Sequence, residues 1–386
     1  MKLGALGDLF LGDQLSCLGF GVRSYCDQNG YDHLFDGLRS TLQGYDFVVS
    51  NLETVLSQAR DGDENSFNLV LNRGHPRAAA AIKAAGIHLL TLANNHILDY
   101  GASGIEDTVE CLERAGLAHC GTKHKSIHFH ENNGRRYAFL SWSLVPDSLE
   151  ASAFYNSAND LSPILRELRE TRSHADKIIL SLHAGNEFIE QPSQNFRRQC
   201  HELIDAGADI ILCHHPHVLQ PIEQYRHGLI AYSLGNFVFC SWSMPCRTGM
   251  ALGLSVDDAR LIKASFFEIS RRFFAPTIIT DEKRIRALTQ HLMSLRPLPT
   301  ESYLQQVRIL RVEHRRSTVL HGLKNFYRTK WRSDLIRLAM TRIKFLWSIR
   351  KAEVNQPDLV YQGPSYVRPG QLRRFLARYS GKPGGT

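Results

Sequence analysis

The sequence predicts an α/β protein, a layered sandwich in which strands and helices alternate along the chain. Short apolar runs typical of buried strands recur through the first 240 residues, and most of them are followed at once by polar side chains. The predicted helices between them cover residues 76–85, 104–115, 163–174 and 193–205. A basic, helix-forming segment follows residue 280, outside this alternation.

The first two predicted strands each end in oxygen-bearing side chains. The run that begins at Leu3 ends at Asp8, where glycines allow the backbone to turn tightly around the carboxylate. A second run, residues 47–50, leads into Asn51 and Glu53. Because ligands of open α/β sheets bind at the carboxyl ends of strands, these side chains are candidate ligands of a metal ion.

A third strand, residues 89–92, ends abruptly in a polar loop. The loop carries two carboxamides, an imidazole and a carboxylate, at Asn94, Asn95, His96 and Asp99. We interpret it as the mouth of an active site, with His96 and Asn94 as catalytic candidates. The alternative is a turn whose Asn and Asp side chains satisfy backbone groups.

Two later strands end in histidine. These histidines are His183, after residues 177–182, and His214, His215 and His217, after residues 209–213. Three imidazoles in four residues would repel one another if protonated, and would lose solvation if buried neutral without partners. A bound metal ion resolves both problems, whereas the alternative is surface histidines beside a turn proline. A last strand, residues 229–239, could bring Asn236 to the same site.

The composition is that of an ordinary globular protein, with 386 residues of which 43% are hydrophobic. No stretch reaches the roughly 18 unbroken apolar residues of a membrane span, and Asp8 interrupts the apolar start that a signal peptide needs. We therefore expect a cytoplasmic protein, with peripheral attachment to a membrane as a second option. The eight cysteines form no Cys-x-x-Cys pair, so we expect buried reduced thiols.

Six motifs follow one another in order: Gly7-Asp8, Asn51-Leu-Glu53, Ala93-Asn-Asn-His96, Ser181-Leu-His183, His214-His-Pro-His217 and Tyr232-Ser-Leu-Gly-Asn-Phe237. Together they closely resemble the CapA family, which is named for capsular poly-γ-glutamate synthesis and looks like a branch of the calcineurin-like metallophosphoesterases. The resemblance spans roughly residues 3–250. It implies a four-layer αββα sandwich, with a di-metal centre at the strand ends.

The resemblance also implies roles for single residues. The implied metal ligands are Asp8, Glu53 or Asn51, Asn95, His183, and the pair His215 and His217. His96 resembles the histidine that stabilises the leaving group. Phe10 stands where the wider superfamily has a histidine, a departure that would weaken one metal position or leave a single ion. Ala184 replaces an expected aromatic residue after His183, so substrate contacts would differ.

Oxygen and nitrogen donors without thiolate suit divalent manganese, iron or zinc, and we expect two ions. The residues expected to support the ligands or the substrate are His214, Asp99, Glu187, Glu223 and Asn236. For Glu187 and Glu223 the alternative is a surface carboxylate without a role in the site.

The net charge of +8 is unevenly distributed: residues 1–282 sum to −9, residues 283–351 to +14, and the remainder to +3. We therefore divide the chain into an α/β domain over 1–280, a basic helical segment over 281–351 and a loosely ordered tail over 352–386. Apolar periodicity predicts helices over 281–295, after 300 and over 334–349, packed on the domain or joined in a small bundle.

Three functions fit these observations. The first is a metal-dependent hydrolase of the phosphoesterase type, acting on a small-molecule or polymer substrate with anionic groups in capsule or cell-envelope metabolism. The second is a non-hydrolytic component of polymer synthesis, supported by the missing first-motif histidine. The third is a module that docks on an anionic membrane or polymer through residues 283–351. We do not expect a nucleic acid partner, because no binding motif accompanies the charge, and the oligomeric state is unknown.

Overall fold

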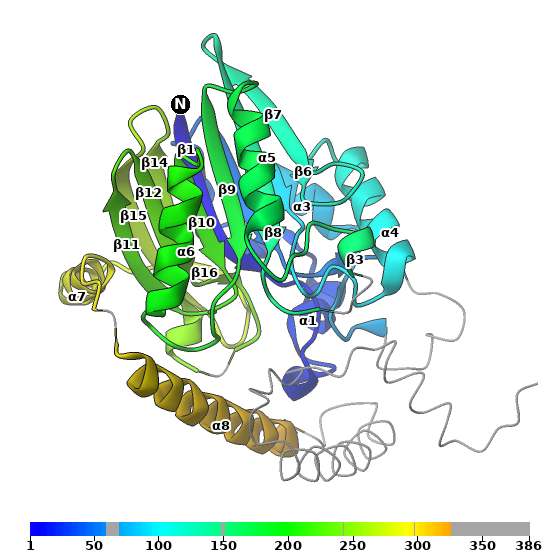
Figure 1. The fold of residues 1–386 in the computed structure, drawn as a ribbon. Helices are drawn as coiled ribbons and strands as arrows, with labels where there is room; N and C mark the ends of the chain where they lie inside the picture. Colours follow the sequence, from blue (N-terminus) through cyan, green and yellow to red (C-terminus); the bar gives the residue numbers. More distant parts are fainter. Residues whose placement is uncertain (59–68, 148–150, 242, 297, 326–386) are drawn as a thin grey trace, which may run out of the picture.

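The computed structural model describes residues 1–325, apart from residues 59–68, 148–150, 242 and 297. In this part of the chain two large β-sheets face each other, and helices cover the outer side of each sheet (Figure 1). The predicted α/β class and the four-layer αββα arrangement are therefore confirmed. The helix predicted over residues 334–349 and the tail over 352–386 lie outside the described residues.

The first sheet has eight strands, in the order β16-β15-β14-β1-β2-β5-β6, with β13 paired to β1 beside this path. Its strands are β1 (Lys2–Leu9), β2 (Phe47–Leu52), β5 (Leu89–Thr91), β6 (Ala118–Cys120), β13 (Asn236–Val238), β14 (Thr248–Ser255), β15 (Arg260–Ile269) and β16 (Pro276–Ile278). β1, β2, β5 and β6 run parallel, so their carboxyl ends lie at the same edge of the sheet.

The second sheet has six strands, in the order β11-β12-β10-β9-β8-β7. Its strands are β7 (Ile127–Asn132), β8 (Arg135–Ser143), β9 (Lys177–His183), β10 (Ile210–His214), β11 (Leu219–Tyr225) and β12 (Gly228–Leu234). The four inner strands are parallel, and β7 and β11 pair antiparallel at the two edges. Two very short strands, β3 (Val55–Leu56) and β4 (Arg73–Gly74), pair separately.

Apolar side chains fill the three spaces between the four layers. Val49 of β2 and Leu212 of β10 belong to the core between the sheets, and every residue of β2 is buried because both of its faces are covered. The helices over the first sheet are α1 (Val22–Asn29), α2 (Arg39–Leu42), α3 (Ala78–Ala84) and α4 (Gly101–Arg114). Those over the second sheet are α5 (Ser162–Arg172) and α6 (Gln194–Asp205). Single 3-10 turns are η1 (Leu15–Cys17), η2 (Asp32–Leu34), η4 (Ala151–Ala153) and η5 (Pro245–Arg247).

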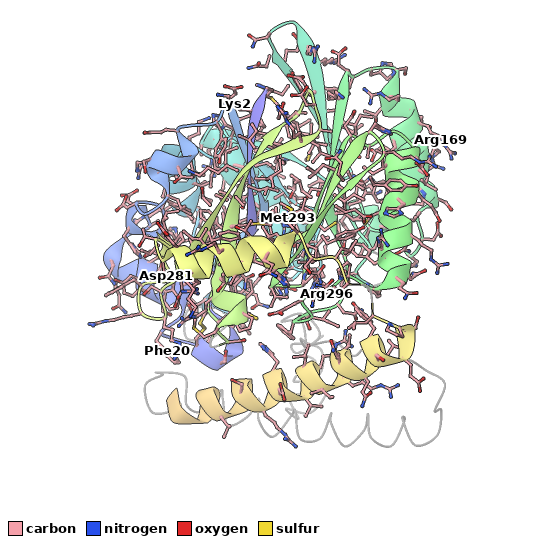
Figure 2. The ribbon with its side chains drawn as sticks, turned by 90° about the vertical axis from the view of Figure 1, so that its left-hand side faces the viewer. Lys2, Phe20, Arg169, Asp281, Met293 and Arg296 are labelled. Atoms are coloured by element: carbon pink, nitrogen blue, oxygen red, sulfur yellow. A yellow bond between two sulfur atoms is a disulfide. The ribbon has the colours of Figure 1, made fainter. Side chains whose placement is uncertain are left out.

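Two helices follow the last strand, α7 (Glu282–Leu292) and α8 (Thr300–Asn325). Leu292 is buried in the core between the sheets and Ile285 packs against that core, so the predicted apolar face of the first helix contacts the α/β domain. α8 lies across the carboxyl ends of the central strands, at the end of the molecule opposite Lys2 (Figures 1 and 2). None of the helices in the described ranges is long and apolar enough to cross a membrane.

The cysteines differ from the expectation of reduced thiols. Cys17 of η1 and Cys240, which follows β13, form a disulfide, while the other six cysteines are buried and free. The two paired residues are 223 positions apart in the chain. Only the packing of η1 beside β13 brings them together, so spacing in the sequence could not indicate this pair.

Candidate metal centre

Parallel strands bring most of the predicted site residues to one end of the sandwich. In the first sheet Asp8 of β1 is in register with Asn51 of β2, and Glu53 follows directly. In the second sheet His183 and His214 are in register at the ends of β9 and β10. The carboxyl ends of the two sets of strands lie together, so side chains far apart in sequence become neighbours.

Two overlapping groups of side chains could each hold a metal ion. The first group consists of Glu53, His183 and His215, and the second of Asp8, Glu53 and His217. Within each group one ligand atom from every residue lies within 4.8 Å of the others, and all of these residues are buried. Glu53 belongs to both groups, so a single carboxylate could contact two ions.

The Glu53 carboxylate lacks the partners that a buried charge requires. Its side chain is 0% exposed, and neither oxygen accepts a hydrogen bond from the described residues. Burial and the nearby charge of Asp8 raise the pKa of Glu53 to about 7. His183 Nε2 lies 3.5 Å from Oε1 and His217 Nδ1 lies 3.9 Å from Oε2. Carboxylate and imidazole donors converging on this point suit a divalent cation, so the residues present fit the expected metal.

Asp8 is ionised and held in a fixed orientation. Its Oδ1 accepts a hydrogen bond from Asn51 Nδ2 at 2.8 Å, and its Oδ2 accepts one from the backbone N–H of His215 at 3.2 Å. Burial raises the pKa of Asp8, but His214 and His217 outweigh it and hold this pKa well below its usual value. His214 Nδ1 lies 3.1 Å from Asp8 Oδ1 and thus borders the second group.

Two of the histidines are neutral, which is the form that binds a metal ion. Burial lowers the pKa of both His183 and His215 far below the ordinary value of an imidazole. His183 Nε2 also lies 2.9 Å from the side-chain oxygen of Asn95. The Asn95 amide therefore stands beside the first group, at a point where its oxygen could join the ligands.

His217 is fixed by Asn236 and by the carboxylates of the second group. Its Nδ1 lies 3.0 Å from Asn236 Oδ1 and 3.5 Å from Asp8 Oδ2. Burial lowers the pKa of His217, but Glu53 and Asp8 outweigh that effect and raise this pKa to about 10. The two carboxylates thus attract positive charge to this point of the site. Asn236 is itself held, since its amide donates to the Cys246 carbonyl at 2.8 Å.

His96 and Asp99 form a pair beside the two groups. His96 Nδ1 lies 2.8 Å from Asp99 Oδ2, and His96 Nε2 lies 4.0 Å from Glu53 Oε1. Burial lowers the pKa of His96, but Asp99 and Glu53 outweigh it and raise the pKa above its ordinary value. Asp99 also accepts a hydrogen bond from Asn72 at 3.0 Å, which fixes the carboxylate. The His96 imidazole is therefore aimed at the site without belonging to either group.

Asn94 and Asn51 hold the loops together. Asn94 is 0% exposed, its amide donates to the Leu52 carbonyl at 2.8 Å, and its oxygen accepts the N–H of His96 at 3.1 Å. The side chain thus closes the turn, as the alternative interpretation of this loop had it, and the catalytic role of Asn94 stays a prediction. The Asn51 oxygen accepts from Thr91 Oγ1 at 3.4 Å, while its amide donates to Asp8.

Phe10, the departure predicted in the first motif, packs among aromatic rings. Its ring is buried, packs on Phe239 with 4.9 Å between centroids, and meets His96 edge-on at 6.3 Å. An aromatic contact thus occupies the place where an imidazole was expected. The second group contains one imidazole, that of His217, whereas the first group contains two.

The two glutamates predicted to support the site lie in different places. Glu187 is partly exposed on the loop after β9; burial raises its pKa, and it lies within the electrostatic reach of His217. Glu223 does not reach the centre, and the prediction that it orients a ligand is corrected. Its carboxylate contacts Arg197, His201 and Tyr232, the tyrosine at 2.6 Å. The reason is that β11 starts beside the site and runs away from it.

Replacing Glu223 with glutamine is expected to destabilise the fold at neutral pH by about 1–3 kcal/mol. Burial raises the pKa of Glu223, but hydrogen bonds from Arg197 and Tyr232 outweigh it and lower the pKa to about 2. A carboxyl group with a lowered folded-state pKa stabilises the protein above its unfolded-state value of 4.5, and this contribution disappears as the pH falls towards 2.

Urea unfolding at pH 7, 5 and 3 measures this effect. The difference between Glu223→Gln and wild type should shrink between pH 5 and pH 3. The control is Glu110→Gln, whose exposed pair with Arg114 should contribute less than about 1 kcal/mol at every pH. A difference for Glu223→Gln that does not change with pH would contradict the assignment.

Sequence reasoning did not single out three residues around the centre. Asn72 contacts Asp99, Phe188 lies with its ring 6.1 Å from that of His217, and Arg311 hydrogen-bonds the loop that bears Phe188. Asn72 lies on a turn, with a φ of 49°, and is 27 residues from Asp99. The sequence could have indicated Phe188 as a neighbour of the site, because it follows the ligand candidate His183 by five residues.

Comparison with curated proteins finds relatives that include two proteins from Bacillus species. The capsule biosynthesis protein CapA of Bacillus anthracis is 32% identical over 236 residues, and the PGA biosynthesis protein CapA of Bacillus subtilis is 31% identical over 241 residues. The alignments cover 58% and 60% of this chain, and 57% and 62% of the relatives. The chain thus spans less than two thirds of the length of these relatives.

A solved structure described as a novel phosphatase from Mycoplasma pneumoniae is also similar, with 14% identity and a TM-score of 0.45, over 74% of this chain and 96% of that one. The family model described as "Bacterial capsule synthesis protein PGA_cap" matches residues 2–241. This match covers more than half of the chain and contains every residue of the two ligand groups. The chain therefore belongs to the bacterial capsule synthesis protein family.

Proposed function

We propose that the protein is a divalent-metal-dependent hydrolase of the phosphoesterase type that acts on an anionic substrate in capsule or cell-envelope polymer metabolism. One observation carries the proposal: a buried carboxylate without a hydrogen-bond partner, Glu53, is common to two ligand groups beside the His96–Asp99 pair. A fold that needed these residues only for stability would gain little from a buried carboxylate that accepts no hydrogen bond.

The chain's own residues have separate parts in this chemistry. Glu53, His183 and His215 would hold one ion with Asn95 beside them, and Asp8, Glu53 and His217 would hold the other. Divalent manganese, iron or zinc bound there would supply Lewis-acid polarisation of a phosphoryl or acyl oxygen. His96, which Asp99 orients through Nδ1, holds a proton on the side facing Glu53 and can donate it to the leaving oxygen.

The names of the relatives support the pathway in which we place this activity. Both Bacillus proteins are described as biosynthesis proteins, one for a capsule and one for PGA. An anionic polymer, or a small molecule from which such a polymer is assembled, is therefore the substrate class that we propose. The two ligand groups of this site support hydrolysis of a phosphoester or of an amide or ester bond.

Metal content and hydrolysis measured on the same samples test this function. Elemental analysis of wild type and His217→Ala, with turnover of a generic phosphodiester, should give about two ions per chain in wild type, and fewer ions with loss of turnover in the variant. The control is His227→Ala, because His227 is exposed and belongs to neither group. A wild-type protein with less than one ion and no turnover of phosphodiester, ester or amide substrates would contradict the proposal.

The observation at Phe10 supports a second candidate function. With phenylalanine at position 10, the second group has fewer donors than it would have with a histidine there. The centre could then serve polymer synthesis as a structural metal site without hydrolysis. A protein that binds one ion tightly and is stabilised by it, yet turns over no ester or amide, would favour this assembly role.

A further inference from the structure

α8 lies outside the family match, yet it contacts the loop that follows the ligand candidate His183. Tyr303 and Val307 of α8 form a small buried cluster with Ile189 of this loop. The Asn186 amide donates a hydrogen bond to the Tyr303 hydroxyl at 3.2 Å. Figures 1 and 2 show α8 running along the end of the sandwich where the central strands finish. The helix is thus a wall of the metal centre.

A stack of three rings fixes the distance between α8 and the ligands. Phe188 stacks on His314 of α8, with 3.9 Å between ring centroids and 13° between planes. On the other side the Phe188 ring lies 6.1 Å from that of His217, inclined by 29°. Burial, with a smaller effect of His217, lowers the pKa of His314 to about 4, so this histidine is neutral at pH 7.

Arg311, one turn before His314, adds a positive charge to this wall. Its guanidinium has few hydrogen-bond partners. Its Nη2 donates to Asn186 Oδ1 at 3.1 Å, while its Nε is buried and donates to none of the described residues. Burial raises the pKa of the nearby Glu187 carboxyl, and this guanidinium lies within electrostatic reach and acts to lower that pKa, but the two groups form no ion pair within 4.0 Å among the described residues. A guanidinium has five donors, and removing them from water without an acceptor is costly.

We propose that Arg311 forms an anion subsite beside the metal centre, where its guanidinium binds a carboxylate or phosphate group of the substrate. This proposal rests on the proposed function in one respect: the bound anion is taken to be part of the substrate of the proposed hydrolase. A planar fork that is already oriented by Asn186 matches both anions, which accept two parallel hydrogen bonds. The subsite would select substrates that carry a negative charge next to the bond acted on.

Binding of short anionic oligomers to the full-length, metal-loaded protein tests the subsite. The probes are a γ-linked glutamate tetramer for carboxylate, inorganic tripolyphosphate for phosphate, and a γ-linked glutamine tetramer as the uncharged control, each titrated by calorimetry. Arg311→Met should weaken binding of at least one anionic probe by about tenfold or more, and Arg311→Lys by less. The glutamine tetramer should bind wild type and variants equally.

The matched control is Arg308→Met, an exposed arginine on the same helix. Metal content and circular dichroism of each variant show whether it is folded. Wild type that binds neither anion, or an Arg311→Met protein that binds both within twofold of wild type, would overturn the subsite. Anion binding that depends on Arg311 in a protein without any hydrolytic turnover would overturn the proposed function and leave the subsite standing.

Discussion

Replacing Glu53 with glutamine is expected to reduce bound metal from about two ions per chain to less than one, with loss of hydrolysis. The reason is that Glu53 belongs to both ligand groups, so the substitution removes an anionic ligand from each at once. Changing His215 or His217 alters one group only. Elemental analysis after equilibration with excess manganese or zinc and gel filtration measures the difference.

The same substitution should have the opposite effect on stability once the metal is removed. In chelator-treated protein the Glu53 carboxylate is buried without a hydrogen-bond partner, and exchanging it for a neutral amide should stabilise the fold by about 1–3 kcal/mol. Thermal unfolding with and without chelator tests this reversal. Glu187→Gln is the control, because Glu187 is nearby and belongs to neither group. Equal metal content in Glu53→Gln and wild type would refute the shared-ligand role.

Replacing His96 with asparagine should lower turnover by about 10²–10⁴-fold while metal content stays unchanged. His96 lies beside the groups without belonging to either, and its contact with Asp99 orients the ring towards Glu53. A general acid matters only when the leaving oxygen needs a proton. The loss should therefore be large for an alkyl phosphodiester and small for a p-nitrophenyl ester.

Rates for a series of leaving groups, with metal analysis of the same protein, distinguish this role from a structural one. A neighbouring variant, Asp99→Asn, should shift the alkaline limb of the pH profile to lower pH with the same substrates, because Asp99 contributes to the raised pKa of His96 and a general acid must be protonated. Equal loss over all leaving groups, or loss of metal from His96→Asn, would show that His96 acts by holding the site together.

The location of the centre was predictable because its residues share a simple sequence pattern. Asp8, Glu53, His183 and His215 each stand at or just after the end of a buried apolar strand, and parallel strands end together. The four-layer arrangement came from the resemblance, since alternation of strands and helices fixes the α/β class without fixing how many sheets form.

The remaining features depend on contacts that leave no periodic signal. Asparagine is a residue type that can act in catalysis, and only the hydrogen bond to the Leu52 carbonyl shows that Asn94 holds the loop in place. β14 is buried along nearly its whole length and contains two glycines, so it shows no alternation of apolar and polar residues. The position of α8 over the strand ends rests on Phe188 and Asn186, residues that carry no helix-docking pattern of their own.

The backbone of the histidine loop has a consequence for the choice of metal. His215 and His217 have φ values of 96° and 60°, conformations that cost a residue other than glycine about 1–3 kcal/mol each. Contacts in the folded protein offset this cost, since Asp8 accepts the N–H of His215 and Asn236 contacts the His217 ring. The two imidazoles, one in each ligand group, are thus held in place by the fold. Selectivity among ions of similar affinity then depends on ionic radius and coordination geometry, and the protein sets it when it folds.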